Sequence, residues 1–222
     1  MSKNRVLANL ENIDRWNPSP TDNLWDIPTI KASMAEPNEL VGFNFMLSRK
    51  GKPSKWLHCF LHDYQIQRLW NNPDAYIAAI KRRGYGGILS PDFSLYMDMP
   101  LALQIYNTYR NRWVGAYMRT HGIQVIPTVS WSGPKSYDFC FLGIEPHGTV
   151  AISTVGINKP DVVSGFFEGY AAMMDRLEPR NVLIYGRRLD GLQGTYYPPF
   201  YKEIEHCSQE ARTSPHKMLS VV

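Results

Sequence analysis

The sequence predicts an α/β fold with a mainly parallel sheet and flanking helices. From residue 56 onward, short apolar runs alternate with segments whose apolar residues recur at helical spacing. The runs are nearly continuous, which is typical of parallel strands covered on both faces. The chain has 222 residues, whereas a complete eightfold βα barrel needs roughly 250. We therefore expect either an open, doubly wound sheet or an incomplete, barrel-like one.

Composition divides the chain into three segments. Residues 1–40 are expected to form an irregular arm that Trp16 and Trp25 hold on the body. Prolines interrupt any helix there, at Pro18, Pro20, Pro28 and Pro37. Residues 41–188 are expected to form a single α/β domain, and residues 189–222 a polar C-terminal extension.

The first two apolar runs cover residues 41–47 and 56–61. The link of about eight residues between them is too short for a crossover helix. The two runs therefore form a hairpin, or the first run is an edge strand.

A helix is expected over residues 74–83, because Tyr76, Ile77 and Ile80 are spaced along one helical face. Pro73 suits its first turn, and three cations complement the helix dipole at its end. A short strand is expected over residues 86–90.

The clearest helix begins near Asp98, a good N-cap residue, and ends at Gly122. Its apolar stripe recurs every four residues: Leu101, Ile105, Tyr109, Trp113 and Tyr117. We expect a strand over residues 123–129 and an irregular segment over residues 133–148.

The last predicted elements repeat the strand–helix–strand order. Residues 149–155 and 181–185 read as buried strands. Between them, a helix is expected from Pro160 to Pro179. Its apolar stripe is Val162, Val163, Phe166, Phe167, Tyr170, Met174 and Leu177.

Ligands of parallel α/β folds bind beyond the carboxyl ends of the strands. Asp63 and Asp92 follow two such ends and are the candidate catalytic pair, one carboxyl protonated and one ionised. The alternative is that both are structural caps. The candidate ligand-binding residues are Ser90, Ser130, Trp131, Ser132, Thr154, Asn158 and Arg187. Trp131 either provides a surface on which a ligand stacks or fills the open end of the sheet. Arg187 either binds an anionic group or is exposed to solvent.

No metal site is predicted. His58 and His62 are four residues apart, but on a strand this spacing separates them by about 13 Å, which is too far for one metal unless the strand ends between them. The P-loop, GxGxxG before a helix, GxSxG and HExxH patterns are all absent from the sequence. The sequence names no cofactor and leaves open whether the protein catalyses a reaction.

The charge is mildly basic, at +4. The candidate nucleic-acid-binding residues are Lys81, Arg82 and Arg83, although a solvated helix end explains the same run. No apolar run approaches the roughly 20 residues of a membrane span. Cys59, Cys140 and Cys207 are sparse and odd in number, which favours the reducing cytoplasm.

Three stretches resemble a domain family of unknown function carried by phages and plasmids. They are GGILSPDFSLYMDMP at residues 86–100, NTYRNRW at residues 107–113 and IPTVSWS at residues 126–132. Some members of that family are labelled rolling-circle replication protein. The resemblance implies a mobile-element origin in a bacterial host and brings no catalytic residues with it. Such initiators present a His-x-His pair, which is absent from this sequence.

Three hypotheses about function follow. The first is a phage or plasmid protein that binds or hydrolyses a nucleotide- or sugar-like ligand at the strand ends. The second is a nucleic-acid-binding accessory protein of replication. The third is an interaction protein that targets a host protein without catalysis, through residues 1–40 or the C-terminal extension.

Overall fold

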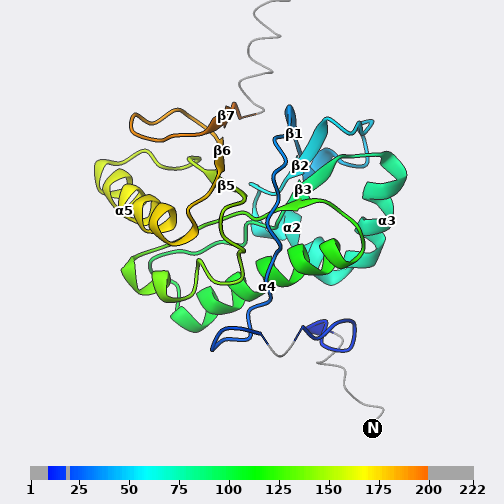
Figure 1. Cartoon of the computed structure of the whole chain (residues 1–222), viewed down its shortest axis with the longest axis horizontal. Helices are drawn as coiled ribbons and strands as arrows, with labels where there is room; N and C mark the ends of the chain where they lie inside the picture. Colours follow the sequence, from blue (N-terminus) through cyan, green and yellow to red (C-terminus); the bar gives the residue numbers. More distant parts are fainter. Residues whose placement is uncertain (1–9, 19–20, 200–222) are drawn as a thin grey trace, which may run out of the picture.

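The computed structural model describes residues 10–18 and 21–199 as strands around a common interior with helices outside (Figure 1). The strands form two parallel sheets, each in chain order. The first contains β1 (Glu39–Gly42), β2 (Lys55–His58), β3 (Gly87–Leu89) and β4 (Val125–Ile126). The second contains β5 (Thr149–Ser153), β6 (Asn181–Tyr185) and β7 (Thr195–Tyr197).

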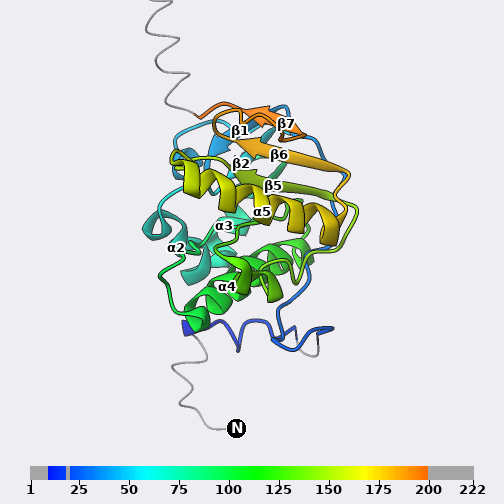
Figure 2. The same cartoon turned by 90° about the vertical axis from the view of Figure 1, so that its left-hand side faces the viewer.

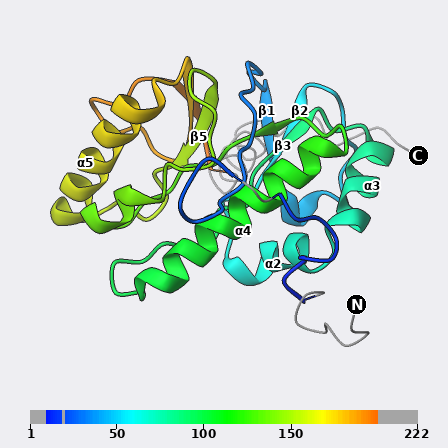
Figure 3. The same cartoon turned by 60° about the horizontal axis from the view of Figure 1, so that its bottom comes forward.

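The helices lie outside the strands on both halves of the molecule. They are α2 (Asp63–Asn71), α3 (Pro73–Arg83), α4 (Leu101–Thr120) and α5 (Pro160–Leu177), with short 3-10 helices η1 (Phe43–Phe45) and η2 (Pro134–Asp138). Helix α5 lies against β5 and β6 (Figure 2). Helix α4 runs across the molecule from the α5 side to the α3 side (Figure 3). None of the described helices is long and apolar enough to cross a membrane.

The two sheets meet at a seam beside β4. Val129 donates its backbone N–H to the Ala151 carbonyl at 2.8 Å, and Ala151 donates to the Pro127 carbonyl at 2.9 Å. The strand order therefore continues from β1 to β7 without reversal. A doubly wound sheet requires a reversal of strand order, so that alternative is wrong and the incomplete-barrel alternative is correct.

The strands enclose one apolar interior. Its buried members come from β2 through β7 and their immediate ends: Trp56, Leu89, Ile126, Ala151, Leu183, Tyr185 and Tyr197. The Tyr197 hydroxyl donates to the Pro37 carbonyl, so the end of β7 lies beside the segment that leads into β1. Residues from six strands thus share a core, as side chains do inside small barrels.

Helix α4 buries polar side chains as well as apolar ones. The Arg112 guanidinium is 1% exposed and donates to three carbonyls, those of Leu142 (2.9 Å), Thr128 (3.0 Å) and Cys140 (2.7 Å). It therefore ties α4 both to the end of β4 and to the irregular segment that follows η2.

A second buried polar group links β3, β4 and α4. The Ser90 hydroxyl donates to the Asn111 side-chain oxygen at 2.7 Å and accepts the Thr128 N–H at 2.8 Å. The Thr128 hydroxyl donates back to the Ser90 carbonyl at 2.8 Å. These bonds fix the positions at which β3 and β4 end.

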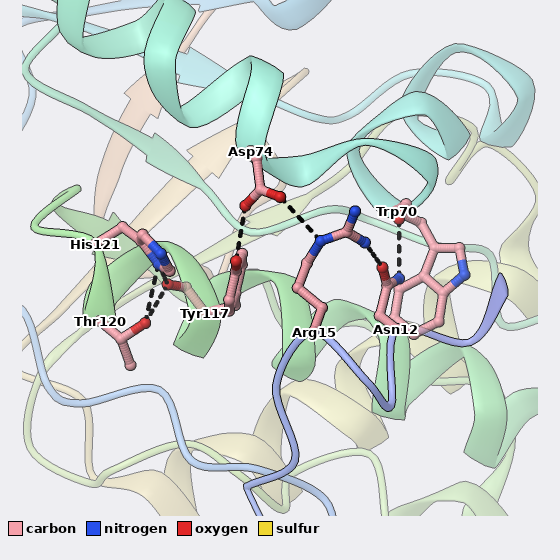
Figure 4. A network of polar contacts seen from close by, with 7 residues as sticks. All are labelled: Asn12, Arg15, Trp70, Asp74, Tyr117, Thr120 and His121. Atoms are coloured by element: carbon pink, nitrogen blue, oxygen red, sulfur yellow. Dashed lines mark hydrogen bonds and ion pairs between the residues drawn. The ribbon is translucent and has the colours of Figure 1, made fainter. Parts of the chain in front are cut away.

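The described part of the N-terminal arm is anchored at Trp16, whose ring packs on Trp113 at 5.8 Å. Beside it, Arg15 pairs with Asp74 at 3.0 Å, and Asp74 also accepts the Tyr117 hydroxyl at 2.7 Å (Figure 4). Trp25 is 44% exposed and does not anchor the arm.

Most predicted elements are present with shifted ends. The strand expected over residues 41–47 is β1, which ends at Gly42, and the chain continues into η1. Strand β1 lies at the edge of the sheet and pairs parallel to β2. The hairpin alternative is therefore wrong. Asp98 is not the N-cap of α4, because that helix begins after Pro100.

Two elements were not predicted. Helix α2 begins directly after His62, and β7 lies in the segment expected as a C-terminal extension, where it pairs with β6. Residues 200–222, with Cys207, lie outside the described residues.

We expect Arg112→Met to lower the free energy of unfolding by about 3–5 kcal/mol, because the Cys140 and Leu142 carbonyls lose their Arg112 donor and the Thr128 carbonyl keeps the Asn111 amide as its donor. Urea denaturation measures this loss. Arg82→Met, at an exposed position of α3, is the matched control and should change stability by less than about 0.5 kcal/mol. Equal effects of the two substitutions would contradict the role given to Arg112.

Candidate ligand-binding site

A pocket of about 510 Å³ opens at the carboxyl ends of β2 to β5. Its polar lining residues are His62, Gln65, Asp92, Ser94, Tyr96, Ser130 and Ser153. Its apolar lining residues are Phe60, Leu61, Leu95, Val129, Trp131, Ile152, Val155, Ile157 and Phe166. The pocket lies at the end of the sheet where parallel α/β folds bind ligands.

Asp92 lies three residues after the end of β3 and lines this pocket. Its Oδ1 atom is buried and has no hydrogen-bond partner among the described residues. Burial raises the pKa of Asp92 to about 7, against an opposing hydrogen bond from Ser130. The charge of Asp63 raises the pKa further, and that of Arg112 lowers it. Asp92 is thus a carboxyl that changes protonation near neutral pH.

Asp63 does not line the pocket. It is the first residue of α2, and its carboxylate accepts the Ser94 hydroxyl at 2.8 Å and the Ser94 N–H at 3.3 Å. Asp63 thereby positions Ser94, which does line the pocket. The two carboxyls of the predicted pair are electrostatically coupled, but of the two only Asp92 faces the cavity.

Trp131 forms one wall of the pocket and packs on α5. Its ring lies 5.2 Å from that of Phe166 and 6.3 Å from that of Phe141. Gly169 faces the indole so closely that a methyl group there would overlap its nitrogen. Trp131 therefore closes the gap between β4 and α5 and also lines the cavity, so its role as a platform on which a ligand stacks stays a prediction.

The other predicted ligand-binding residues divide into two groups. Ser130 lines the pocket beside Asp92. Outside the lining, Ser90 bonds to Asn111, Ser132 donates to Gln104, and Thr154 donates to the Arg187 carbonyl. Asn158 and Arg187 are exposed, and the Arg187 guanidinium donates to the carbonyl of Ile157 at the pocket edge.

Several lining residues were missed by the sequence analysis. Ser94 and Tyr96 share a loop with Asp92, so a search of the whole segment after β3 would have found them. Gln65 belongs to the unpredicted helix α2. Phe166 belongs to the expected stripe of α5, where spacing does not distinguish core from pocket.

The structure does not bring His58 and His62 together at one site. His62 lines the pocket, whereas His58 is 2% exposed and stacks on Tyr185 at 4.2 Å. Burial lowers the pKa of His58 to about 3, which keeps its ring neutral. The described residues contain no group of three His, Cys, Asp or Glu side chains suited to a metal ion.

The basic run of α3 lies at the opposite end of the strands. Lys81 and Arg82 are exposed, and Arg83 donates to the Arg49 carbonyl at 3.0 Å. This bond places the run of α3 beside a second one that contains Arg49, Lys50 and Lys52.

Comparison with known proteins identifies relatives of this chain. The family model described as "Domain of unknown function (DUF4417)" matches residues 19–202. The "Gene 1 protein" of Mycobacterium phage D29 is 38% identical over 171 residues, 76% of this chain and 63% of that protein. The "Gene 1 protein" of Mycobacterium phage L5 is 38% identical over 170 residues, 75% of this chain and 73% of that protein. This chain thus spans less than two thirds of the D29 protein. No solved structure matches.

Gly169→Ala should destabilise the fold by about 1–3 kcal/mol, because the methyl group displaces Trp131 in a packed interface. Thermal unfolding measures the loss. Gly165→Ala is the matched control one helical turn away, where a methyl group meets no atom within 4 Å. That control should stabilise α5 by up to about 1 kcal/mol. If both substitutions stabilise the protein, Trp131 is not held as described.

Asp92→Asn should stabilise the protein at pH 8 and have little effect at pH 4. The ordinary pKa of 3.8 applies to the unfolded chain, and the folded value is about 7. Between these values the folded state binds more protons, so stability falls as the pH rises. Each pKa unit corresponds to about 1.4 kcal/mol, so the gain at pH 8 is a few kcal/mol at most. A pH-independent difference between wild type and variant, measured by urea denaturation, would contradict this account.

Proposed function

This chain belongs to the DUF4417 family, and from that premise we propose that it binds a small, ring-bearing polar ligand in the pocket. A nucleoside- or sugar-like molecule fits a cavity that combines several hydroxyl groups, an amide and aromatic walls. Asp92 is the candidate general acid or base, and Ser130 and Ser94 are candidate hydrogen-bonding partners of the ligand.

One observation carries the proposal: a carboxyl with an unpartnered, buried oxygen lines the pocket and has a pKa near 7. A group that is half protonated at neutral pH both donates and accepts a proton efficiently. Above pH 7 the ionised Asp92 carboxylate does not stabilise the fold, because its burial is unfavourable. Buried charged groups that lower stability in this way are typical of functional sites.

The groups around Asp92 determine its pH response. A hydrogen bond from Ser130 and the charge of Arg112 on α4 lower the Asp92 pKa, and the charge of Asp63 on α2 raises it. The charge of Asp92 in turn raises the pKa of Cys59, in the segment after β2. His62 lines the same cavity. For a hydrolytic step, ionised Asp92 would take a proton from water as the water oxygen attacks the ligand, and would return that proton to the leaving group.

A second candidate function is nucleic-acid binding, as an accessory protein of replication on a phage or plasmid. The supporting observation is the bond from Arg83 to the Arg49 carbonyl, which gathers two basic runs at the end of the strands away from the pocket. Clustered cations bind phosphates without reading sequence. Lys81 and Arg82 would supply the exposed charge.

We also propose that the protein acts in the cytoplasm of a bacterial host. The relatives from two mycobacteriophages support an origin in phage-infected bacteria. Cys59 and Cys140 are both free and buried, which agrees with a reducing compartment.

The test is a thermal-shift screen with nucleosides, nucleotides, sugars and short DNA at low and high salt. A ligand that binds the native state raises the melting temperature by mass action. We expect a salt-insensitive shift with at least one small molecule, and its loss in Asp92→Ala.

The same screen distinguishes the second candidate. A shift with DNA alone that disappears at high salt, and that is lost when Lys81, Arg82 and Arg83 are all changed to Gln, would favour nucleic-acid binding over the pocket. No shift with any small molecule would contradict the proposed pocket function.

A further inference from the structure

The side chains that line the pocket are unbalanced in charge. Among the described residues that line it, Asp92 is the acidic one, and none is Lys or Arg. Phosphate- and carboxylate-binding sites usually supply guanidinium, ammonium or backbone N–H donors. Here the side-chain chemistry is a carboxyl with hydroxyl groups around it.

The nearest cations are engaged elsewhere. Arg112, behind Asp92, is 1% exposed and donates to three carbonyls. Arg187 donates to the carbonyl of Ile157 from outside the lining. An anionic group inside the cavity would therefore face Asp92 with no described lining cation to balance it.

The walls and rim of the pocket are rich in aromatic rings. Phe60, Tyr96, Trp131 and Phe166 line the cavity. At its mouth, Tyr96 is 60% exposed and Val155 is 53% exposed. Aromatic faces attract cations and stack on planar groups, while an apolar rim disfavours a strongly hydrated phosphate.

We propose that the group which enters this pocket is a planar, cationic nitrogen group of the amidine or guanidine type, and not a phosphate or carboxylate. Its N–H groups donate charge-assisted hydrogen bonds to the Asp92 carboxylate, and its plane packs on the Trp131 and Phe166 wall. This inference rests on the proposed function, because it assigns a ligand class to the same pocket.

Binding of such a cation is linked to the protonation of Asp92. The cation favours the ionised carboxyl, so binding near pH 7 releases a proton and affinity rises with pH. Asp63, Arg112, Cys59 and His62 are the charged or titratable groups near Asp92 in this response.

The experiment compares benzamidine, benzamide and benzoate, which share one ring and a planar substituent but carry charges of about +1, 0 and −1 at pH 8. Isothermal titration calorimetry on the full chain measures each affinity. We expect benzamidine to bind at least roughly tenfold more tightly than benzoate. Its affinity should fall several-fold from pH 8 to pH 6.

Two variants test whether Asp92 is the cause. Asp92→Asn should reduce benzamidine affinity roughly tenfold and leave benzamide affinity within about threefold. Asp98→Asn is the matched control, because it removes an exposed carboxylate from the same loop outside the lining. It should leave all three affinities unchanged. Circular dichroism confirms that each variant is folded.

The other outcomes separate the two proposals. If benzoate binds as tightly as benzamidine, or if Asp92→Asn binds benzamidine as well as wild type does, the charge inference is wrong and the pocket function stands. If benzamidine fails to bind while a nucleoside or sugar does, the inference is again wrong and the pocket function stands. If no small molecule binds, both are overturned.

Discussion

The buried guanidinium of Arg112 is the interaction on which the architecture depends. Strand β4 is short, and the chain after it runs through η2 and a further irregular stretch before β5 begins. Carbonyls in such a stretch need donors when they are buried. Arg112 supplies them from α4 to Cys140 and Leu142, and it also binds Thr128 at the end of β4. Arg112 thereby supplies hydrogen-bond donors to a connection in which the structure has no α-helix, whereas a βα unit usually has one there.

The pocket follows from this arrangement. Because Arg112 and the Ser90–Asn111 bond fix where β3 and β4 end, the residues that follow those strands converge on one cavity. The burial of Asp92 and the charge of Asp63 favour its neutral form, and the charge of Arg112 favours its ionised form. The site therefore combines a scaffold of buried hydrogen bonds with one carboxyl whose pKa is raised to about 7.

The sequence predicted the elements whose residues repeat at helical spacing. Helices α3, α4 and α5 were identified because apolar residues recur on one face of each helix. Examples are Ile77 and Ile80 in α3, and Trp113 and Tyr117 in α4. Helix α2 was missed because it is only nine residues long. The buried polar face of α4 was also missed, since Asn111 and Arg112 have no apolar period and depend on partners distant in sequence.

The candidate site was predictable in part, for a similar reason. The rule that ligands bind at strand ends selects Asp92, Ser130 and Trp131, and all three line one pocket. It does not predict the direction of a side chain: the Ser90 hydroxyl donates to the Asn111 side chain, and the Thr154 hydroxyl donates to the Arg187 carbonyl, both outside the pocket lining. Gln65 and Phe166 reach the cavity from helices, and their approach depends on packing angles that no local pattern encodes.

The seam between β4 and β5 is held by few backbone hydrogen bonds. Two backbone hydrogen bonds join the strands there, in contrast to the continuous ladder between β5 and β6. The cavity lies across this seam, with Asp92 and Trp131 on one side and Ile152 and Ser153 on the other. Local opening begins where such bonds are few. A molecule bound in the pocket would contact both sides of this seam and would therefore oppose its local opening.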